Sequence, residues 1–303
     1  MTQESEPVVY VNGEFQPSRA ASVSVFDHGL LYGDGVFDTM FASYGYIFKL
    51  DQHIARLSRS MRAVRLEIAI SLDALRDAVV ETVARNGLRS AYIKVLVTRG
   101  VSPEPLLDPR ECTPTLIIFA RPYLSLADPE KLGSGLHAKV VSIRRVDMQA
   151  LDPRIKSLNY LNLVLARMEA YAAGCDEALL LDSDGNVCEA PGYNVFVVKD
   201  GRLTTPATGI LEGITRETVL ELCEQVGIPS EIRSVAPYEL AVADEVFLSS
   251  TAGGLVPISR VDGQPVGLGR PGPVIAELLR EYDTLQESGK CGTPVTTSLP
   301  ADS

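Results

Sequence analysis

A stretch rich in proline and glycine, residues 121–135, divides this 303-residue chain into two parts that each carry strand and helix patterns of their own. It contains two prolines and two glycines and has no sustained apolar period, which is typical of a connection between domains. The sequence therefore predicts a small domain over residues 1–120, a linker over 121–135 and a larger domain over 136–285. A segment rich in Gly, Ser, Thr and Pro predicts a disordered tail over 286–303.

Both parts mix strands with helices, so the predicted fold class is α+β. In the first part, residues 8–15 predict a hairpin with its turn at Asn12-Gly13, strand patterns occur at 92–98 and 115–120, and helical spacing at 53–64 and 72–86. In the second part, strands are predicted at 139–145 and 186–189, and a hairpin at 194–199 and 202–205 with its turn at Asp200-Gly201. Helices are predicted at 157–173, 215–226 and 273–285. The helix at 157–173 has an apolar stripe on one face, which predicts that this face packs on the core. The stripe consists of Leu158, Leu161, Leu165, Met168 and Ala172.

An amine, a carboxylate and two glycine-containing turns follow one another in the second part. Lys156 precedes a helix, Glu189 ends a strand, Gly213 begins the next helix, and Ser250 opens a second turn. Pyridoxal phosphate needs a lysine for a Schiff base, an anion opposite its pyridine nitrogen and N–H donors for its phosphate. Each residue alone is more often an exposed side chain or an ordinary helix start. Their ordered combination predicts a pyridoxal phosphate site.

Charge and composition exclude several other classes of function. A net charge of -11 and a pI of about 4.9 oppose binding to nucleic acid or anionic membranes. The five cysteines show no C-x-x-C spacing and indicate free thiols, and there is no signal peptide and no apolar run of about 18 residues. A cytoplasmic, soluble protein is expected. Only three histidines are present, without H-E-x-x-H, G-x-S-x-G or P-loop runs, so no metal site is predicted.

Six motifs together carry a resemblance that covers roughly residues 8–285. They are VFDHGLLYGDGVF at 25–37, HIARL at 53–57, KSLNY at 156–160, EAPGYN at 189–194, LEGITR at 211–216 and ADEVF at 243–247. The chain closely resembles the class IV (fold type IV) pyridoxal phosphate enzymes: branched-chain, D-amino-acid and (R)-amine aminotransferases and aminodeoxychorismate lyase. This resemblance implies a small α/β domain, a larger pseudo-barrel domain, and a homodimer with a shared active-site cleft.

The resemblance also implies a role for each matching residue. Lys156 is implied as the Schiff-base lysine and proton carrier, and Glu189 as the partner of the pyridinium nitrogen. The other implied cofactor-binding residues are Tyr160 at the phenolate oxygen, Leu211 on the ring, and Arg56, Gly213, Ile214, Thr215, Ser250 and Thr251 around the phosphate. The implied substrate-binding residues are Tyr32, Phe37, Thr39, Lys94 and Ala252.

The substrate pattern departs from each branch of the family. Branched-chain enzymes usually carry Glu-Gly-x-Arg where this chain has Asp38-Thr39-Met40-Phe41, and the loop at 101–106 lacks the Arg and His of bacterial D-amino-acid enzymes. The sequence therefore predicts an aminotransferase that moves an amino group to a 2-keto acid. Its donor is a branched-chain amino acid, or else an (R)-amine or D-amino acid. Aminodeoxychorismate lyase, which releases pyruvate, and a non-catalytic cofactor-binding protein remain the alternatives.

Overall fold

The computed structural model describes residues 6–104, 106–123 and 133–295, which form two compact units. The first unit takes the described residues of Met1–Leu124, Ile155–Asn159 and Leu285–Ser303, and the second those of Ser125–Arg154 and Tyr160–Thr284. Of the predicted linker, 124–132 lies outside the described residues, and its first two residues continue a strand. The segment that carries Lys156 belongs to the first unit, although the sequence predicted it in the larger domain.

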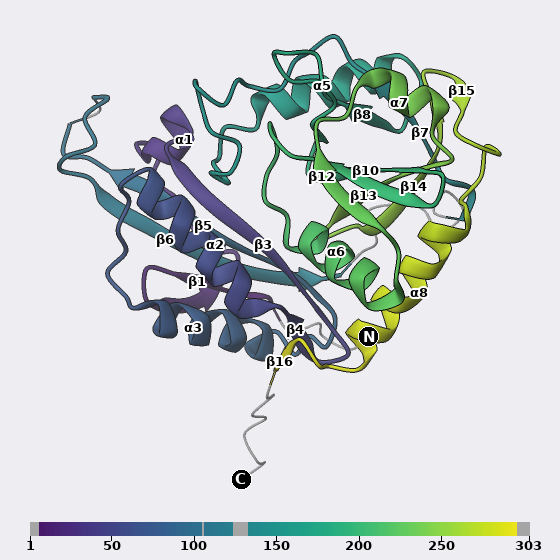
Figure 1. The fold of residues 1–303 in the computed structure, drawn as a ribbon. Coiled ribbons are helices and arrows are strands. Elements are labelled where there is room, and N and C mark those ends of the chain that lie inside the picture. Colours follow the sequence, from purple (N-terminus) through teal and green to yellow (C-terminus); the bar gives the residue numbers. More distant parts are fainter. Residues whose placement is uncertain (1–5, 105, 124–132, 296–303) are drawn as a thin grey trace. The chain divides into compact units, whose positions relative to one another are not determined.

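The first unit is built on a seven-stranded sheet with the order β16-β4-β3-β5-β6-β1-β2. Its strands are β1 (Val8–Val11), β2 (Glu14–Pro17), β3 (Gly35–Ser43), β4 (Tyr46–Phe48), β5 (Ala91–Val101), β6 (Thr113–Pro122) and β16 (Gly292–Pro294). Its helices are α1 (His28–Tyr32), α2 (Leu50–Ala63) and α3 (Leu72–Arg85). Figure 1 shows α2 and α3 lying along one face of this sheet, where α2 contacts β3 and α3 contacts β6.

Every strand pair in this sheet is antiparallel, and β3 and β5 form its centre. Side chains alternate between the two faces of a strand, so Val36, Asp38 and Met40 of β3 share one face, and Phe37 and Thr39 share the other. Val36 and Met40 belong to the apolar core that includes the buried residues of α2 and α3. The odd-numbered residues of β3 therefore lie on the sheet face opposite the two helices.

The end of the chain does not match the predicted disordered tail. Helix α8 (Pro273–Glu287) continues to Glu287, and β16 then pairs antiparallel with β4, with Thr293 opposite Ile47. Residues 296–303 lie outside the described residues. The prediction was wrong over 286–295 because local composition is rich in turn-forming residues, whereas the strand is stabilised by pairing with residues far away in the sequence.

The second unit contains a nine-stranded mixed sheet whose central strands close into a barrel-like ring. Its strands are β7 (Leu136–Val140), β8 (Glu177–Leu179), β9 (Glu189–Ala190), β10 (Tyr193–Lys199), β11 (Arg202–Pro206), β12 (Ser230–Arg233), β13 (Glu245–Ser250), β14 (Gly254–Val261) and β15 (Gln264–Pro265). The order runs β10-β13-β14-β7-β8, and β9 pairs with β10. The ring closes because the Leu180 amide donates to the Glu189 carbonyl and the Cys188 amide to the Leu180 carbonyl. The predicted α+β fold with a pseudo-barrel is confirmed.

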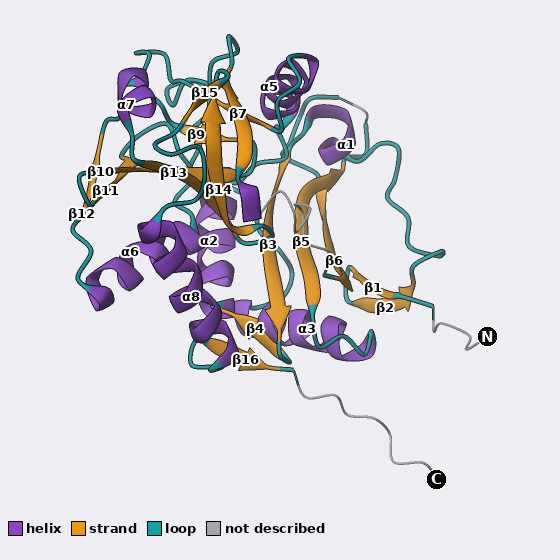
Figure 2. Cartoon of the chain, turned by 90° about the vertical axis from the view of Figure 1, so that its right-hand side faces the viewer, coloured by secondary structure: helices purple, strands orange, loops and turns teal. Residues whose placement is uncertain are grey.

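Helices α5 (Leu161–Ala172), α6 (Ile214–Val226) and α7 (Pro237–Val242) pack around this ring. Figures 1 and 2 both place α5 and α7 at the upper end of the sheet and α6 below it. Helix α5 begins at Leu161, four residues later than predicted, because Ser157 and Leu158 pair with β3 instead. Strand β7 also ends earlier than predicted, since Glu169 of α5 accepts hydrogen bonds from the backbone and hydroxyl of Ser142.

The buried face of α5 is not the predicted one. Leu163, Ala166 and Ala170 are buried, whereas the predicted core stripe is exposed. The large apolar residues exposed on this helix are Leu161, Val164, Leu165, Met168 and Tyr171. Both faces of α5 are apolar, and small residues permit its close approach to the sheet. Periodicity shows which side chains share a face but not which face is packed. Leu161, Leu165 and Met168, which were predicted as core, therefore belong to an apolar surface on this single chain.

No helix among the described residues has the length and apolar character that crossing a membrane requires.

Candidate active site

Lys156 is held by its backbone against the edge of β3. Its carbonyl accepts from the amide of Phe37 at 2.9 Å, and its own amide donates to Oγ of Ser60 at 3.2 Å. The neighbouring Ser157 forms an antiparallel bridge with Val36, and the amide of Leu158 donates to Gly35. A segment distant in sequence thus extends the sheet by a few residues, which fixes the starting point of the Lys156 side chain.

The Lys156 amine lies over the ring of Phe37. Its Nζ is 4.7 Å from the ring centroid, and the Nζ of Lys94 is 4.4 Å from the same centroid. Lys94 is also opposite Thr39 in the β3–β5 pairing. Four predicted site residues therefore meet on one face of the first unit. Each ammonium–ring contact stabilises a charge by about 0.5–2 kcal/mol, depending on its exposure to solvent.

On the other face of β3, a buried cluster joins the strand to α2. Arg56 donates from Nε to Oδ2 of Asp38 at 2.9 Å and from Nη2 to Oδ1 at 2.8 Å. Nδ1 of His53 lies 2.7 Å from Oδ1 of the same carboxylate, while its Nε2 is buried and has no hydrogen-bond partner in the described structure. Two nitrogens of the Arg56 guanidinium are thus engaged by Asp38, so the carboxylate sets the orientation of the predicted phosphate ligand.

Burial opposes charge within this cluster. Burial raises the pKa of the Asp38 carboxyl, but the charges of Arg56 and His53 and their hydrogen bonds hold that pKa well below its usual range. Burial lowers the pKa of His53 below 6.5, against an opposing effect of Asp38. At neutral pH the cluster is therefore an ionised carboxylate paired with an arginine, beside a neutral imidazole.

Tyr32 lies at the end of a short helical turn that is fastened at both sides. Asp27, fully buried, caps the turn by accepting from the amide of Gly29 at 2.7 Å, and it accepts from the hydroxyls of Thr98 and Thr115 at 2.9 and 2.8 Å. The Tyr32 ring is exposed and meets the buried His28 ring edge-on, with centroids 4.9 Å apart.

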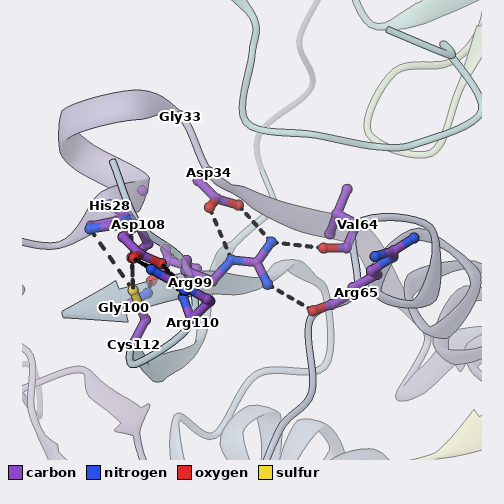
Figure 3. Close-up of polar contacts among 12 residues, drawn as sticks. His28, Gly33, Asp34, Val64, Arg65, Arg99, Gly100, Asp108, Arg110 and Cys112 are labelled. Carbon is purple, nitrogen blue, oxygen red and sulfur yellow. Dashed lines mark hydrogen bonds and ion pairs between the residues drawn. The ribbon is translucent and has the colours of Figure 1, made fainter. Parts of the chain in front are cut away.

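Arg99 links the chain after this turn to the end of α2, as Figure 3 shows. It donates to both carboxylate oxygens of Asp34, and to the carbonyls of Val64 and Arg65 at 2.7 and 2.8 Å. The position of Tyr32 is therefore fixed by buried and half-buried polar contacts rather than by apolar packing of its own side chain.

In the second unit, Glu189 lies where the ring of strands closes. Its Oε1 accepts from Nε of Arg145 at 2.6 Å, and its Oε2 accepts from the amide of Leu211 at 2.9 Å. The carboxylate is only 6 % exposed. Glu189 begins β9 instead of ending a strand as predicted. A buried carboxylate with a charged donor on one oxygen and an amide on the other has a fixed orientation.

The turn that carries Leu211 leads into the N-terminus of α6. Asn194, which pairs with Glu189 across β9 and β10, donates to the carbonyl of Leu211 at 2.8 Å. Gly213 is the N-cap of α6 and supplies no side-chain hydrogen bond. A Cβ at Gly213 would lie 2.0 Å from Oδ1 of Asn194. The turn therefore accepts only glycine without rearrangement. The first amides of this 13-residue helix, including those of the buried Ile214 and Thr215, form a potential anion site.

Ser250 closes a second turn at the end of β13. Its hydroxyl accepts from the amide of Gly253 at 2.8 Å, and this turn follows Ser249, which pairs with Asn194. Glu189, Asn194 and Ser249 are thus in register across three neighbouring strands, and both predicted phosphate-binding turns begin beside this row. Thr251 and Ala252 lie in the second turn and are half-buried.

The predicted residues fall into two groups by unit. The first unit brings together Lys156, Phe37, Thr39 and Lys94 on one sheet face, with Arg56 on α2. The second unit holds Tyr160 and Glu189 and the residues of both turns, which are Leu211, Gly213, Ile214, Thr215, Ser250, Thr251 and Ala252.

Several residues that organise the site were not predicted. Arg145 was placed in a strand with no role, although it is the charged partner of Glu189. Asp38, His53 and Asn194 occur within or beside the quoted motifs, but their positioning roles depend on contacts that sequence spacing does not reveal. Among the described residues, no three His, Cys, Asp or Glu side chains are placed to hold a metal ion.

Comparison with known proteins places these features in one family. The family model "Amino-transferase class IV" matches residues 35–261. A putative branched-chain-amino-acid aminotransferase of Methanocaldococcus jannaschii is 42% identical over 92% of this chain and 96% of its own length. A D-alanine aminotransferase of Bacillus licheniformis is 36% identical over 88% and 92%. The crystal structure of the T.th. branched-chain amino acid aminotransferase with pyridoxamine 5'-phosphate superposes with a TM-score of 0.92 at 33% identity, covering 97% of this chain and 100% of that one.

Proposed function

Because the chain belongs to the class IV aminotransferases, which depend on pyridoxal phosphate, we propose that it transfers the amino group of a branched-chain L-amino acid to 2-oxoglutarate. The observation that carries the proposal is the ion pair between Arg145 and Glu189, together with the N-terminus of α6 at Gly213. This arrangement offers a fixed anion and a group of amide donors from one turn. Those two features suit the ring nitrogen and the phosphate of the cofactor.

The described residues fit pyridoxal phosphate. The Lys156 amine is half-buried and its peptide is fixed on β3, which suits a covalent bond to the cofactor aldehyde. The turn at Gly213 has no space for a Cβ, so its backbone can approach a phosphate closely. When bound, the cofactor supplies an electron sink that stabilises negative charge on the substrate carbon. We assign its ring nitrogen to Glu189, and its phosphate to the amides of Ile214 and Thr215.

Each remaining residue has a proposed task. Lys156 Nζ would hold the proton that leaves the substrate α-carbon. Tyr160 would donate to the phenolate oxygen of the cofactor, and Leu211 would pack on its ring. In the first unit, we assign Arg56, oriented by Asp38, to the phosphate, and Tyr32, Phe37, Thr39 and Lys94 to the substrate. In the second unit, we assign Ser250 and Thr251 to the phosphate and Ala252 to the substrate.

The similar proteins and the side chains near Lys156 both support a branched-chain amino acid as the donor. Both curated relatives and the superposed structure are named as aminotransferases, which favours transamination over the lyase alternative. Phe37 and Thr39 present an apolar ring and a small side chain on the face that carries Lys156, which suits a branched aliphatic group. A D-amino acid is the second candidate donor, because one similar enzyme is a D-alanine aminotransferase. The (R)-amine alternative depends only on residues 251–257, TAGGLVP, which resemble the same segment of the (R)-amine aminotransferases.

We also propose that the enzyme is a homodimer in the cytoplasm. The exposed apolar residues of α5 support a subunit interface, since a single chain rarely exposes so many large apolar side chains on one helix. The free cysteines support a reducing compartment.

A half-reaction with a single donor tests the function. Purified enzyme is mixed with L-leucine, D-alanine or (R)-1-phenylethylamine without an acceptor, and the visible absorbance of the bound cofactor is followed. We expect L-leucine to bleach the cofactor to its pyridoxamine form and the other two to react at least tenfold more slowly. Preferred reaction with D-alanine or the amine would contradict the proposed donor. Consumption of aminodeoxychorismate with the colour retained would contradict transamination.

A further inference from the structure

Two lysine amines share one aromatic ring in the first unit. The Nζ atoms of Lys94 and Lys156 lie 4.4 and 4.7 Å from the centroid of Phe37. Taken together, these distances allow the two nitrogens a separation of at most about 9 Å. Two ammonium groups this close in a partly buried site repel each other enough to change a protonation equilibrium about tenfold.

The backbone limits how far the two amines can separate. Lys94 lies in the middle of β5, paired with both β3 and β6, opposite Thr39 and Phe119. Lys156 is fixed through the amide of Phe37 and the hydroxyl of Ser60. Both side chains therefore start from rigid positions beside the ring that they share.

The carboxylate next to Phe37 on β3 already has a charged partner. Asp38 is paired through both carboxylate oxygens with Arg56 of α2, so these two charges compensate each other. His53 of α2 is a neutral imidazole, because burial lowers its pKa against the opposing effect of Asp38. Burial likewise lowers the pKa of Lys94, and the charge on Lys156 adds to the effect.

We propose that Lys94 is a positioning residue that acts through its charge. Its ammonium group, held over the ring of Phe37, favours the neutral and nucleophilic form of Lys156. The proposal rests on the proposed function and deepens it, because neutral Lys156 is the form that attacks an aldehyde. In that step the lone pair of Nζ forms a bond to the aldehyde carbon. The carbonyl oxygen leaves as water together with the two protons of the neutral amine.

Competitive acetylation measures the protonation of each lysine separately. The full chain, freed of cofactor, receives a trace of acetic anhydride over a range of pH, and peptide mass spectrometry gives the acetylated fraction of Lys156. We expect Lys94→Gln to raise the pKa of Lys156 by about one unit, and Lys94→Arg, which keeps the charge, to leave it unchanged. Lys199→Gln, which removes an exposed amine paired with Asp244, is the matched control and should also leave it unchanged.

Two further measurements keep the inference falsifiable if Lys94→Gln folds poorly. In Lys156→Gln, the pKa of Lys94 should rise by about one unit. At a pH below the pKa of Lys156, the rate of pyridoxal phosphate incorporation should fall about tenfold in Lys94→Gln and recover in Lys94→Arg. An unchanged Lys156 pKa in Lys94→Gln, or an equal shift in Lys94→Arg, would overturn the inference. Coupled amines in a chain that does not bind the cofactor would support the inference and refute the proposed function.

Discussion

Arg145 donates from its Nε to Oε1 of Glu189 over 2.6 Å, although the two residues are 44 positions apart in the sequence. The backbone around Arg145 is itself held in place, since the Arg145 amide donates to the carbonyl of Leu181 and the side-chain amide of Asn162 donates to the carbonyl of Arg144. The orientation of Glu189, the proposed partner of the pyridine nitrogen, thus depends on the segment around Arg145, which Asn162 of α5 holds in place.

Removal of the Arg145 charge should destabilise the protein strongly. The side chains of Arg145 and Glu189 are 11% and 6% exposed, and Arg145→Met would remove the charged donor from a buried carboxylate. We expect the free energy of unfolding to fall by about 3 kcal/mol. The control is Arg233→Met, because Arg233 forms exposed ion pairs with Glu231 and Glu239 and its loss should cost under about 1 kcal/mol. Urea unfolding of the cofactor-free chains measures the loss of stability in both variants. Equal losses would contradict the role of Arg145 as the charged partner of a buried carboxylate.

Gly213→Ala should impair cofactor binding selectively. The new Cβ would approach within 2.0 Å of the Asn194 Oδ1, so the turn that offers the amides of α6 must shift. We expect the Kd for pyridoxal phosphate to rise at least about tenfold, which corresponds to about 1.4 kcal/mol.

Gly227 at the other end of α6 provides the matched control for Gly213. It has a φ of 76° and open space around its Cβ position. Gly227→Ala should cost about 1 kcal/mol of stability and leave the Kd unchanged. Equal effects of the two substitutions on the Kd, measured by spectral titration, would show that α6 does not hold the phosphate.

His53 should make the cofactor-free protein less stable in mild acid. Its folded pKa lies below 6.5, so the unfolded chain binds more protons as the pH falls below that value, and stability decreases. The loss is at most about 1.4 kcal/mol for each pH unit below 6.5. Asp38 contributes at lower pH, because its stabilisation is present above its unfolded pKa of 3.8 and is lost only as the pH falls from there towards its lowered folded pKa.

Urea unfolding between pH 7 and about pH 5 isolates the histidine contribution. His53→Gln should flatten the pH dependence in this range, and His137→Gln, at an exposed histidine, should not. A His53→Gln protein with the wild-type slope would contradict the assignment of a neutral buried imidazole.

The exposed face of α5 should hold two subunits together. Leu161 and Met168 are 70% and 60% exposed, so a charge at either position costs little within one chain. We expect Leu161→Asp/Met168→Glu to be monomeric in sedimentation velocity experiments in which the wild type is a dimer. Leu268→Asp, at an 83% exposed residue in the segment that follows β15, is the control and should stay dimeric. A double variant that remains a dimer would exclude this face as the interface.

Local patterns predicted the fold class and the main helices and strands of both units. The helical period at 72–86 matches α3, for example, and the Asn12-Gly13 hairpin and the β10–β11 hairpin were predicted from turn residues. Two errors in the predicted elements occur where a segment pairs with a strand that is far away in the sequence. Residues after Lys156 join β3 instead of a helix, and residues after Gly292 join β4, although their composition is that of a flexible tail.

The sequence predicts a set of site residues but not their arrangement. Motifs point to Lys156 and Glu189 because the chemistry of one cofactor requires both an amine and an anion. The residues that orient them, Arg145 and Asp38, are ordinary charged residues in sequence, and their partners are set by tertiary contacts. The shared ring of Phe37 is equally invisible to spacing, because Lys94 and Lys156 meet it from segments 62 positions apart.

Reduction of the holoenzyme with borohydride, followed by peptide mapping, identifies the lysine that binds the cofactor. We expect the phosphopyridoxyl group on the peptide that carries Lys156, and we expect Lys156→Ala neither to take up the label nor to bleach with L-leucine. A label on another lysine, or a Lys156→Ala enzyme with undiminished activity, would show that Lys156 is not the Schiff-base lysine.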